Sequence, residues 1–285
     1  MRKVGVVGCG LMGSGIAEVC ARAGLDTLVY EVDASVRDAG RDRVERSLAK
    51  AVARGTLTSE ERDGALRALR FTTDLVDFAD RDIAIEAVPE DEEMKLEVFS
   101  TLDRVMVRPD ALLASNTSSI PIMKLAAATG RPGQVVGMHF FNPVPVLELV
   151  ELIPTLRTEV GAWERVRGFA ADVLGRRVIV SQDRAGFVVN ALLVPYLLAA
   201  IRMFESGFAT AGDIDDGMVH GCAHPMGPLR LADLVGLDTT LAIAETLHAE
   251  FREPLYAPPP LLSRMVQAGH VGRKAGRGFY DYPPA

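Results

Sequence analysis

The stretch Val4-Gly-Val-Val-Gly8-Cys-Gly10-Leu-Met-Gly13 decides the fold of the first half of the chain. It is an apolar run followed by three glycines with the spacing G-x-G-x-x-G, and residues 13–21 continue with a helical pattern. A strand, a glycine-rich turn and a helix in this order are typical of the first unit of a dinucleotide-binding fold. The sequence therefore predicts a dinucleotide site at this turn.

Each glycine of the turn has its own task. Gly8 permits the tight bend, Gly10 lets backbone N–H groups approach a pyrophosphate, and Gly13 lets the helix pack closely on the strand. Leu11 and Met12 stand at the start of the helix, whose N-terminus carries partial positive charge. We expect these five residues to hold the phosphates.

A second predicted strand, residues 27–31, ends in Glu31, 18 residues after Gly13. A carboxylate at this place accepts hydrogen bonds from the ribose hydroxyls of NAD and repels the 2′-phosphate of NADP. An acidic residue at a strand end can also be a plain solvated charge. Because strand, turn, helix and acid occur together, we expect Glu31 to bind the ribose and NAD to be the cofactor.

Composition and charge narrow the class of protein. A length of 285 residues suggests about two domains, and 48% hydrophobic with 24% charged residues is ordinary for a globular protein. The net charge of −7 argues against nucleic acid as a partner. Three scattered cysteines are too few for a disulfide framework. The first predicted strand begins at residue 3, so we expect no signal or transit peptide and a reducing, cytoplasmic setting.

The longest apolar run, Gly186 to Ile201, contains Asn190 and Pro195 and stops at Arg202. It is too short and too interrupted for a membrane span, so we expect no membrane contact. The run predicts a buried helix, kinked at Pro195, in a core or a subunit interface.

Strands and helices alternate through the first half of the chain. The predicted strands are 3–8, 27–31, 83–88, 111–115 and 135–139, and the predicted helices are 34–54, 60–70 and 92–107. This alternation implies an α/β fold with a parallel, doubly wound sheet. Two further strands are expected at 147–153 and 178–180, after which the pattern is helical. We therefore expect a Rossmann-like NAD-binding domain at 1–183 and an all-α substrate and dimerisation domain at 184–285.

A hydroxyl and amide cluster, Ser115-Asn-Thr-Ser-Ser119, follows a predicted strand. Ligands of doubly wound sheets lie outside the carboxyl ends of the strands. Ser115 is therefore expected to hydrogen-bond a substrate oxygen or the nicotinamide. Ser118 or Ser119, just before Ile120-Pro121, is expected to cap the next helix.

A histidine and a glutamate stand in two neighbouring apolar stretches. His139 closes the predicted strand 135–139, and Glu151 follows 12 residues later within 147–153. A carboxylate in apolar surroundings is costly unless it is paired, so a His139–Glu151 pair is the natural solution. Glu151 would orient the imidazole, and neutral His139 could take a proton from a substrate hydroxyl as hydride leaves to the nicotinamide. Glu148 alternates to the other face and is expected at the surface.

Polar residues of the second half leave more than one role open. Asn190, within an apolar helix, either holds helices together or points into an interdomain cleft toward the substrate. Lys274 belongs to a glycine-rich tail that is either a solvated loop or a contact to nucleotide phosphates. His220 and His224 are four residues apart with Cys222 between them, but Gly221 weakens the helix, Pro225 ends it, and no Glu stands between them and no other ligand cluster appears. We predict no metal site there or elsewhere.

Taken together, these motifs resemble those of the short-chain L-3-hydroxyacyl-CoA dehydrogenases, in particular the bacterial 3-hydroxybutyryl-CoA dehydrogenases of actinobacterial type. The resemblance covers essentially the whole chain. Its motifs are Gly8–Gly13, Ser115–Ser119, His139-Phe-Phe-Asn-Pro143, Leu149-Val-Glu151, Gly186–Asn190, His224–Pro228, Asp233–Asp238 and Gly276-Arg-Gly-Phe-Tyr280.

The resemblance implies an NAD-dependent enzyme that interconverts 3-hydroxybutyryl-CoA and acetoacetyl-CoA by hydride transfer at C3, and a homodimer built through the C-terminal helical domain. It implies that His139 and Glu151 are the catalytic pair and that Ser115 and Asn190 contact the reacting end of the substrate. The implied NAD site includes Glu31, Glu90, Lys95, Ser115, Asn142 and Lys274. The implied contacts to coenzyme A are Ser47, Arg54, Lys95 and Ser115.

The chain departs from the family pattern at four positions. Ala191 replaces a frequent Arg, Glu148 a frequent Lys, Glu31 a common Asp, and Arg54 a Lys of some relatives. Ala191 and Arg54 bear on substrate length and on contacts to the thioester handle.

Two other function classes share these motifs. One is a dehydrogenase of a carrier-protein thioester or of a free hydroxy acid, and retention of the thioester-site pattern disfavours the free acid. The other is a non-catalytic, nucleotide-binding structural protein, against which the intact His139 and Glu151 argue.

Overall fold

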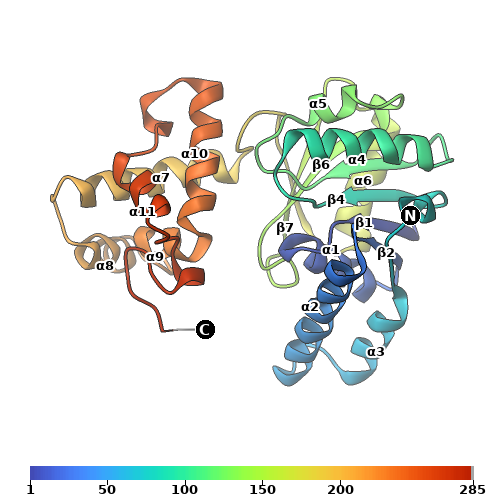
Figure 1. Ribbon diagram of the computed structural model, residues 1–285, viewed down its shortest axis with the longest axis horizontal. Coiled ribbons are helices and arrows are strands. Elements are labelled where there is room, and N and C mark those ends of the chain that lie inside the picture. Colours follow the sequence, from blue (N-terminus) through green and yellow to red (C-terminus); the bar gives the residue numbers. More distant parts are fainter. Residues whose placement is uncertain (284–285) are drawn as a thin grey trace. The chain divides into compact units, whose positions relative to one another are not determined.

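The computed structural model describes residues 1–283, and the chain divides into two compact units, Met1–Arg184 and Ala185–Ala285. The first unit combines helices with one sheet, whereas the second is helical (Figure 1). Each unit has its own hydrophobic core. The two units are therefore described in turn.

Eight strands of the first unit form one mixed sheet in the order β3-β2-β1-β4-β5-β6-β7-β8. The strands are β1 (Lys3–Val7), β2 (Asp26–Tyr30), β3 (Leu69–Thr72), β4 (Ile83–Glu86), β5 (Leu112–Ser115), β6 (Val135–Phe140), β7 (Leu149–Pro154) and β8 (Arg177–Val180). From β1 the chain winds outward in one direction to β3 and then in the other to β8, which defines the doubly wound fold. The predicted fold class is confirmed.

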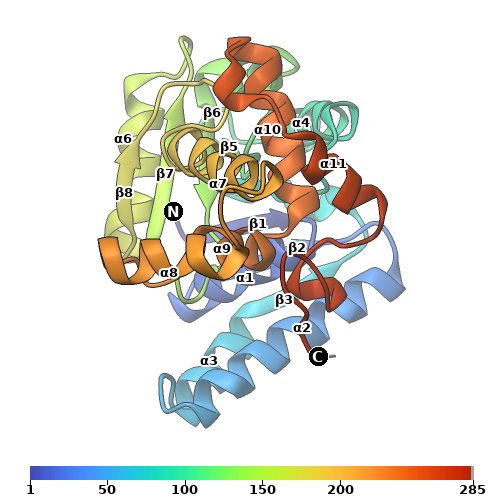
Figure 2. The ribbon, with the colours of Figure 1, turned by 90° about the vertical axis from the view of Figure 1, so that its left-hand side faces the viewer.

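Helices cover both faces of this sheet, and Figure 1 shows α4 in front of the strands and α6 behind them. The helices are α1 (Leu11–Arg22), α2 (Ala34–Ala53), α3 (Ser59–Ala68), α4 (Glu92–Val105), α5 (Ile122–Ala127) and α6 (Val160–Gly168), with short turns η1 (Leu75–Phe78), η2 (Pro132–Gln134) and η3 (Phe169–Val173). Figures 1 and 2 show α2 and α3 side by side.

Alternate strand residues point to opposite faces of the sheet. The face under α1 and α6 is apolar and includes Val4, Val6, Ile83, Ile85, Leu112, Ala114, Val136 and Met138. The intervening residues Glu86, Ser115 and His139 therefore project from the other face. On that face a Cβ added to Gly137 would lie 2.9 Å from the Ile122 side chain of α5, so the strands and this layer of helices are in close contact.

The sheet departs from the predicted parallel arrangement at β7. β6 and β7 are antiparallel, whereas every other neighbouring pair is parallel. Residues 141–148 connect the two strands, which is too short for the crossover that a parallel pair requires. The direction of β7 thus follows from the length of this connection.

A second difference is strand β3. The helical pattern predicted over residues 60–70 ends at Ala68, and Leu69–Thr72 instead pairs in parallel with β2. The strand has four residues and lies at the edge of the sheet, so its own pattern is too short to be distinguished from the end of a helix.

In the described part of the second unit, residues 185–283, five helices pack around an apolar core. They are α7 (Val189–Glu205), α8 (Ala211–Cys222), α9 (Pro228–Val235), α10 (Leu237–Phe251) and α11 (Pro260–Gln267), with short turns η4 (Pro254–Tyr256) and η5 (Arg273–Ala275). On α7 the buried residues Val194, Leu197, Leu198 and Ile201 recur at helical spacing and face this core. Helix α7 continues through Pro195 to Glu205, so the predicted apolar helix exists and the proline does not end it.

Candidate active site

The glycine-rich turn joins β1 to α1, and its three glycines are required for different reasons. Gly8 has φ +91°, and a Cβ there would lie 2.8 Å from the carbonyl oxygen of Ala87. A Cβ on Gly13 would collide with the carbonyl of Gly8. By contrast, a Cβ on Gly10 would meet nothing within 4 Å. Packing thus explains Gly8 and Gly13, whereas Gly10 keeps open a space outside the turn.

This open space fits a dinucleotide pyrophosphate. Helix α1 begins at Leu11 with Gly10 as its N-cap, and no side chain of residues 1–283 caps it. The first N–H groups of a helix have no acceptor within the helix. The amides at Leu11, Met12 and Gly13 are therefore suited to receive an anion at the positive end of the helix dipole.

Glu31 follows β2 and reaches back to the turn. Its Oε1 accepts a short hydrogen bond from the N–H of Cys9, and its Oε2 accepts one from Val32 N at 3.3 Å. Burial raises the pKa of the Cys9 thiol to about 12, and Glu31 adds to the rise while Arg43 opposes it. Cys9 therefore stays a neutral thiol, and Glu31 supplies the negative charge at this end of the turn.

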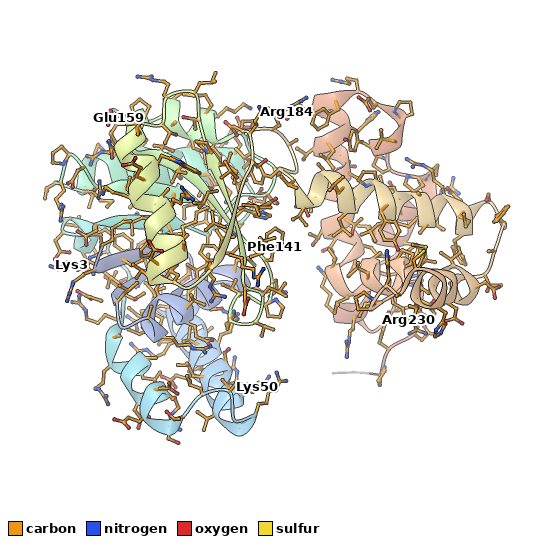
Figure 3. All side chains as sticks on the ribbon, turned by 180° about the vertical axis from the view of Figure 1, so that it is seen from behind. Lys3, Lys50, Phe141, Glu159, Arg184 and Arg230 are labelled. Carbon is orange, nitrogen blue, oxygen red and sulfur yellow. The ribbon has the colours of Figure 1, made fainter. Side chains whose placement is uncertain are left out.

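His139 and Glu151 face each other across β6 and β7. They are opposite residues in the antiparallel register, and Nδ1 of His139 lies 2.7 Å from Oε2 of Glu151. Both side chains are buried. The ring of Phe141, labelled in Figure 3, packs edge-on against the imidazole with centroids 4.7 Å apart. The predicted contact is present, and it fixes the ring so that Nε2 points away from the carboxylate.

Ser115 and Lys95 meet at a buried carboxylate that sequence reasoning missed, Glu86. Ser115 Oγ donates to Glu86 Oε2 at 2.6 Å, and Lys95 Nζ donates to Oε1 at 2.6 Å. The N–H of Val88 also donates to Oε1 at 2.7 Å. Burial raises the pKa of Glu86, and Lys95 and the hydrogen bonds oppose that rise. The sequence contains a pattern that would have predicted this buried carboxylate. Glu86 ends the otherwise apolar strand Ile83–Glu86, just as Glu151 interrupts an apolar stretch.

Glu90 lies beside this cluster and accepts hydrogen bonds from the serine-rich loop that follows β5. Its Oε1 accepts hydrogen bonds from Thr117 Oγ1 at 2.6 Å and from the N–H groups of Ser118 and Ser119 at 2.9 and 3.0 Å, while Oε2 lies 3.2 Å from Lys95 Nζ. Burial alone would raise the pKa of Glu90, but Lys95 and these hydrogen bonds outweigh it and lower the pKa. Glu90 therefore carries charge close to Lys95.

The prediction that Ser118 or Ser119 caps the next helix is wrong. The first N–H groups of α5, at Ile122 and Met123, donate to the carboxylate of Asp183 at 2.8 and 2.7 Å. Both serines instead donate to Glu90. The cap comes from a residue distant in sequence, which a local pattern cannot reveal.

The remaining predicted residues lie elsewhere in the two units. Ser47 is half-buried on α2 near Glu18, and Arg54 is exposed at the end of that helix. Asn142 is exposed after β6. In the second unit Asn190 is buried on α7, and Lys274 Nζ donates to Asp238 at 2.7 Å.

The glycine-rich tail is packed within the second unit. The buried carboxylate of Asp233 accepts hydrogen bonds from the N–H groups of Phe279 and Tyr280 and from the Tyr282 hydroxyl. Tyr280 in turn donates to Asp215 at 2.8 Å. Residues 279–282 are therefore anchored to α8 and α9, which speaks against a freely solvated loop.

Residues 1–283 contain neither a cluster of metal-ligating side chains nor a helix that could span a membrane. Across residues 1–283, no group of three or more His, Cys, Asp or Glu side chains could hold a metal ion. His224 Nδ1 is engaged by the Tyr196 hydroxyl at 3.1 Å. None of the helices in that part of the chain is long and apolar enough to cross a membrane.

The chain belongs to the 3-hydroxyacyl-CoA dehydrogenase family. Residues 3–184 match the family's NAD-binding domain and residues 186–282 match its C-terminal domain. The resemblance seen in the sequence and the expected NAD-binding domain are thereby confirmed.

Particular relatives are similar over their whole length. The chain is 61% identical to 3-hydroxybutyryl-CoA dehydrogenase of Mycobacterium tuberculosis over 99% of both chains. It is 38% identical to human mitochondrial hydroxyacyl-coenzyme A dehydrogenase over 99% of this chain and 91% of that protein. Among solved structures, M. tuberculosis FadB2 matches with a TM-score of 0.98 and 61% identity, covering 99% of both chains. (S)-3-hydroxybutyryl-CoA dehydrogenase PaaH1 of Ralstonia eutropha matches with a TM-score of 0.94 and 42% identity, covering 100% of both.

Proposed function

We propose that this protein is an NAD-dependent 3-hydroxybutyryl-CoA dehydrogenase that oxidises short L-3-hydroxyacyl-CoA thioesters at C3 and reduces acetoacetyl-CoA in the reverse direction. The observation that carries the proposal is the buried His139–Glu151 pair in a chain of this family, at a 2.7 Å separation. NAD, when bound, accepts the hydride from C3. The protein must then remove the hydroxyl proton.

His139 is assigned the role of base for the hydroxyl and of acid for the ketone. Its Nδ1 is engaged by Glu151, so Nε2 is the nitrogen that exchanges the proton with the substrate. Glu151 stabilises the imidazolium and holds the orientation of the ring. Asn190 and Ser115 are assigned to the substrate oxygen. Support for Ser115 is its place at the end of β5, on the sheet face that also carries His139.

We assign the binding of the cofactor, and of the coenzyme A moiety that serves as the handle of the substrate, to the remaining predicted residues. Gly8, Gly10, Leu11, Met12, Gly13 and Glu31 would hold the adenosine and pyrophosphate half of NAD, and Glu90, Lys95, Ser115, Asn142 and Lys274 the rest. Ser47, Arg54, Lys95 and Ser115 would contact coenzyme A. The exposed guanidinium of Arg54 can pair with a phosphate of the handle.

We further propose a cytoplasmic homodimer that associates through the helical unit. Support comes from large apolar side chains left exposed there, including Leu192 on α7 and Phe208 after it. The cysteines Cys9, Cys20 and Cys222 are free, which is typical of a reducing compartment.

The test is a steady-state assay with NADH and either acetoacetyl-CoA or free acetoacetate. We expect acetoacetyl-CoA to be reduced and free acetoacetate to be a very poor substrate, because binding of the distant handle orients the short acyl group. His139→Ala and Glu151→Gln should each lower kcat, the first by roughly two to four orders of magnitude.

Two controls make the assay decisive. Arg54→Ala should raise the KM for acetoacetyl-CoA and leave the KM for NADH nearly unchanged, whereas an effect confined to NADH would remove Arg54 from the handle. Equal turnover of the free acid would contradict the proposed substrate. An acetoacetyl carrier protein, used in a parallel arm, would reveal a carrier-protein dehydrogenase if it were the better substrate.

A further inference from the structure

The residue between the first two glycines of the turn is held by two groups of opposite charge. The N–H of Cys9 donates to the Glu31 carboxylate, and the Cys9 carbonyl accepts a hydrogen bond of 2.7 Å from Arg43 Nη1. Glu31 follows β2, whereas Arg43 stands in the middle of α2. A carboxylate and a guanidinium thus reach one residue of the nucleotide-binding turn from different elements.

The position of Arg43 is fixed by tight packing of α2 on the turn. Gly40 lies three residues before Arg43, on the same side of the helix. A Cβ on Gly40 would lie 2.7 Å from both Cβ and Sγ of Cys9, so the helix touches the turn here without room for a side chain. Arg43 is therefore held beside the turn by the helix and not only by its own flexible stem.

Arg43 retains donors for a ligand. A guanidinium has five N–H groups, and within residues 1–283 the Cys9 carbonyl is the acceptor to which Arg43 donates. No described acidic side chain forms an ion pair with it within 4.0 Å, although the side chain is half-buried. The carboxylate of Asp33, which caps α2 ten residues before Arg43, is engaged by the N–H groups of Ser35 and Val36. Among the described residues, the charge of Arg43 is thus not engaged in an ion pair within 4.0 Å.

In dinucleotide-binding folds, an acid at the end of the second strand accepts the ribose 2′-hydroxyl, whereas an arginine nearby accommodates a 2′-phosphate. This chain holds both groups at one turn. We propose that the turn contains a latent site for adenosine 2′-phosphate in which Arg43 is the cation, and that the Glu31 carboxylate keeps this site closed. The inference rests on the proposed function only in that a nucleotide cofactor binds at this turn.

The experiment measures binding of adenosine fragments by isothermal titration calorimetry, without any turnover. The ligands are 5′-AMP and adenosine 2′,5′-bisphosphate, which differ only in the 2′-phosphate. The proteins are the wild type, Glu31→Ser, the double variant Glu31→Ser/Arg43→Met, and the control Glu31→Ser/Arg41→Met. Arg41 lies on the same helix but extends over the ring of Phe71, with its guanidinium carbon 5.0 Å from the ring centre.

We expect the wild type to bind 5′-AMP more tightly than the bisphosphate. Glu31→Ser should tighten the bisphosphate by about tenfold or more, because repulsion is removed and a charge-assisted contact to Arg43 becomes available. Adding Arg43→Met should abolish that gain and change 5′-AMP binding by about twofold at most, whereas adding Arg41→Met should preserve it.

Equal bisphosphate affinity of Glu31→Ser with and without Arg43 would overturn the proposal. The proposal would also fail if Arg41→Met removed the gain in bisphosphate affinity as fully as Arg43→Met does. The gain would then depend on the overall positive charge of α2 and not on Arg43. A wild type that binds 5′-AMP but does not reduce acetoacetyl-CoA would refute the proposed function and leave this inference standing.

Discussion

Three buried glutamates differ in how their charge is compensated. Glu86 and Glu151 have hydrogen-bond partners, whereas neither carboxylate oxygen of Glu18 on α1 has one among the described residues. Arg22 Nη1 is 3.5 Å away and Ser47 lies nearby. Burial raises the pKa of Glu18, and Ser47 and Arg22 oppose the rise only in part. The charged form of Glu18 therefore costs stability.

Glu18→Gln should stabilise the protein at neutral pH. A folded-state pKa above the unfolded value means that the folded chain binds more protons, so stability falls as pH rises from about the ordinary glutamate pKa through the raised one. The cost is absent below this window and complete above it. We expect a gain of about 1 kcal/mol, or roughly 2–4 °C in Tm, at pH 7.

Thermal melts of both proteins from pH 4 to pH 8 test this. The advantage of the variant should shrink toward pH 4, where the wild-type carboxyl is also protonated. A difference in Tm that is constant across this range would show that the charge of Glu18 is not its cause.

At the residue scale, sequence reasoning works where burial makes a residue type costly. A carboxylate in an apolar stretch predicted the Glu151 partner, and the same argument applied to β4 would have found Glu86. Arg43 could not be found in this way, because it is one of several charges on the polar helix α2. Only the packing of Gly40 against Cys9 brings it to the turn.

At the scale of elements, helix α5 is stabilised by a cap from outside its own neighbourhood. Asp183 Oδ1 and Oδ2 accept from the amides of Ile122 and Met123, 61 and 60 residues away. Asp183→Ala should therefore lower the free energy of unfolding by about 1–2 kcal/mol, since two helical N–H groups lose their acceptor.

Urea denaturation followed by circular dichroism measures this loss. Asp183→Asn is the matched control. Its amide oxygen can still accept a hydrogen bond from one N–H group, so this variant should keep about half or more of the stabilisation that Asp183→Ala loses. An equal loss in Asp183→Asn would point to the charge, and no loss in Asp183→Ala would remove the cap as a stabilising contact.

Elements with long, regular patterns are predictable, and those decided by distant partners are not. Six elements begin and end within a few residues of their predicted bounds. They are helices α2 and α4 and strands β1, β4, β5 and β6. Strand β3 exists because β2 offers an edge to pair with, and β7 reverses because the preceding connection is short. Neither fact is contained in the periodicity of the segment itself.

At the scale of the whole molecule, the helical unit should form the dimer. Leu192 and Phe208 are 72% and 79% exposed, which is unfavourable for large apolar side chains in a monomer. Leu192→Glu and Phe208→Glu should shift the equilibrium toward monomer, because a charge would be buried at the interface. Sedimentation velocity over a concentration series measures the shift.

The matched control is Leu156→Glu, a fully exposed apolar position of the first unit. It should leave the sedimentation coefficient unchanged. A wild type that sediments as a monomer at all concentrations, or a control that dissociates as readily as the two variants, would contradict a dimer built through the helical unit.

The register of β6 and β7 has a consequence for how such enzymes change over generations. His139 and Glu151 are opposite residues of one backbone ladder, and the glycine-rich turn belongs to the same unit. The pair to which we assign proton transfer and the turn that would hold part of NAD are thus encoded together in one continuous stretch of the gene. Of the residues that we assign to substrate and cofactor, Asn190 and Lys274 belong to the second unit, so mutations elsewhere in that unit can accumulate without touching the proposed chemistry.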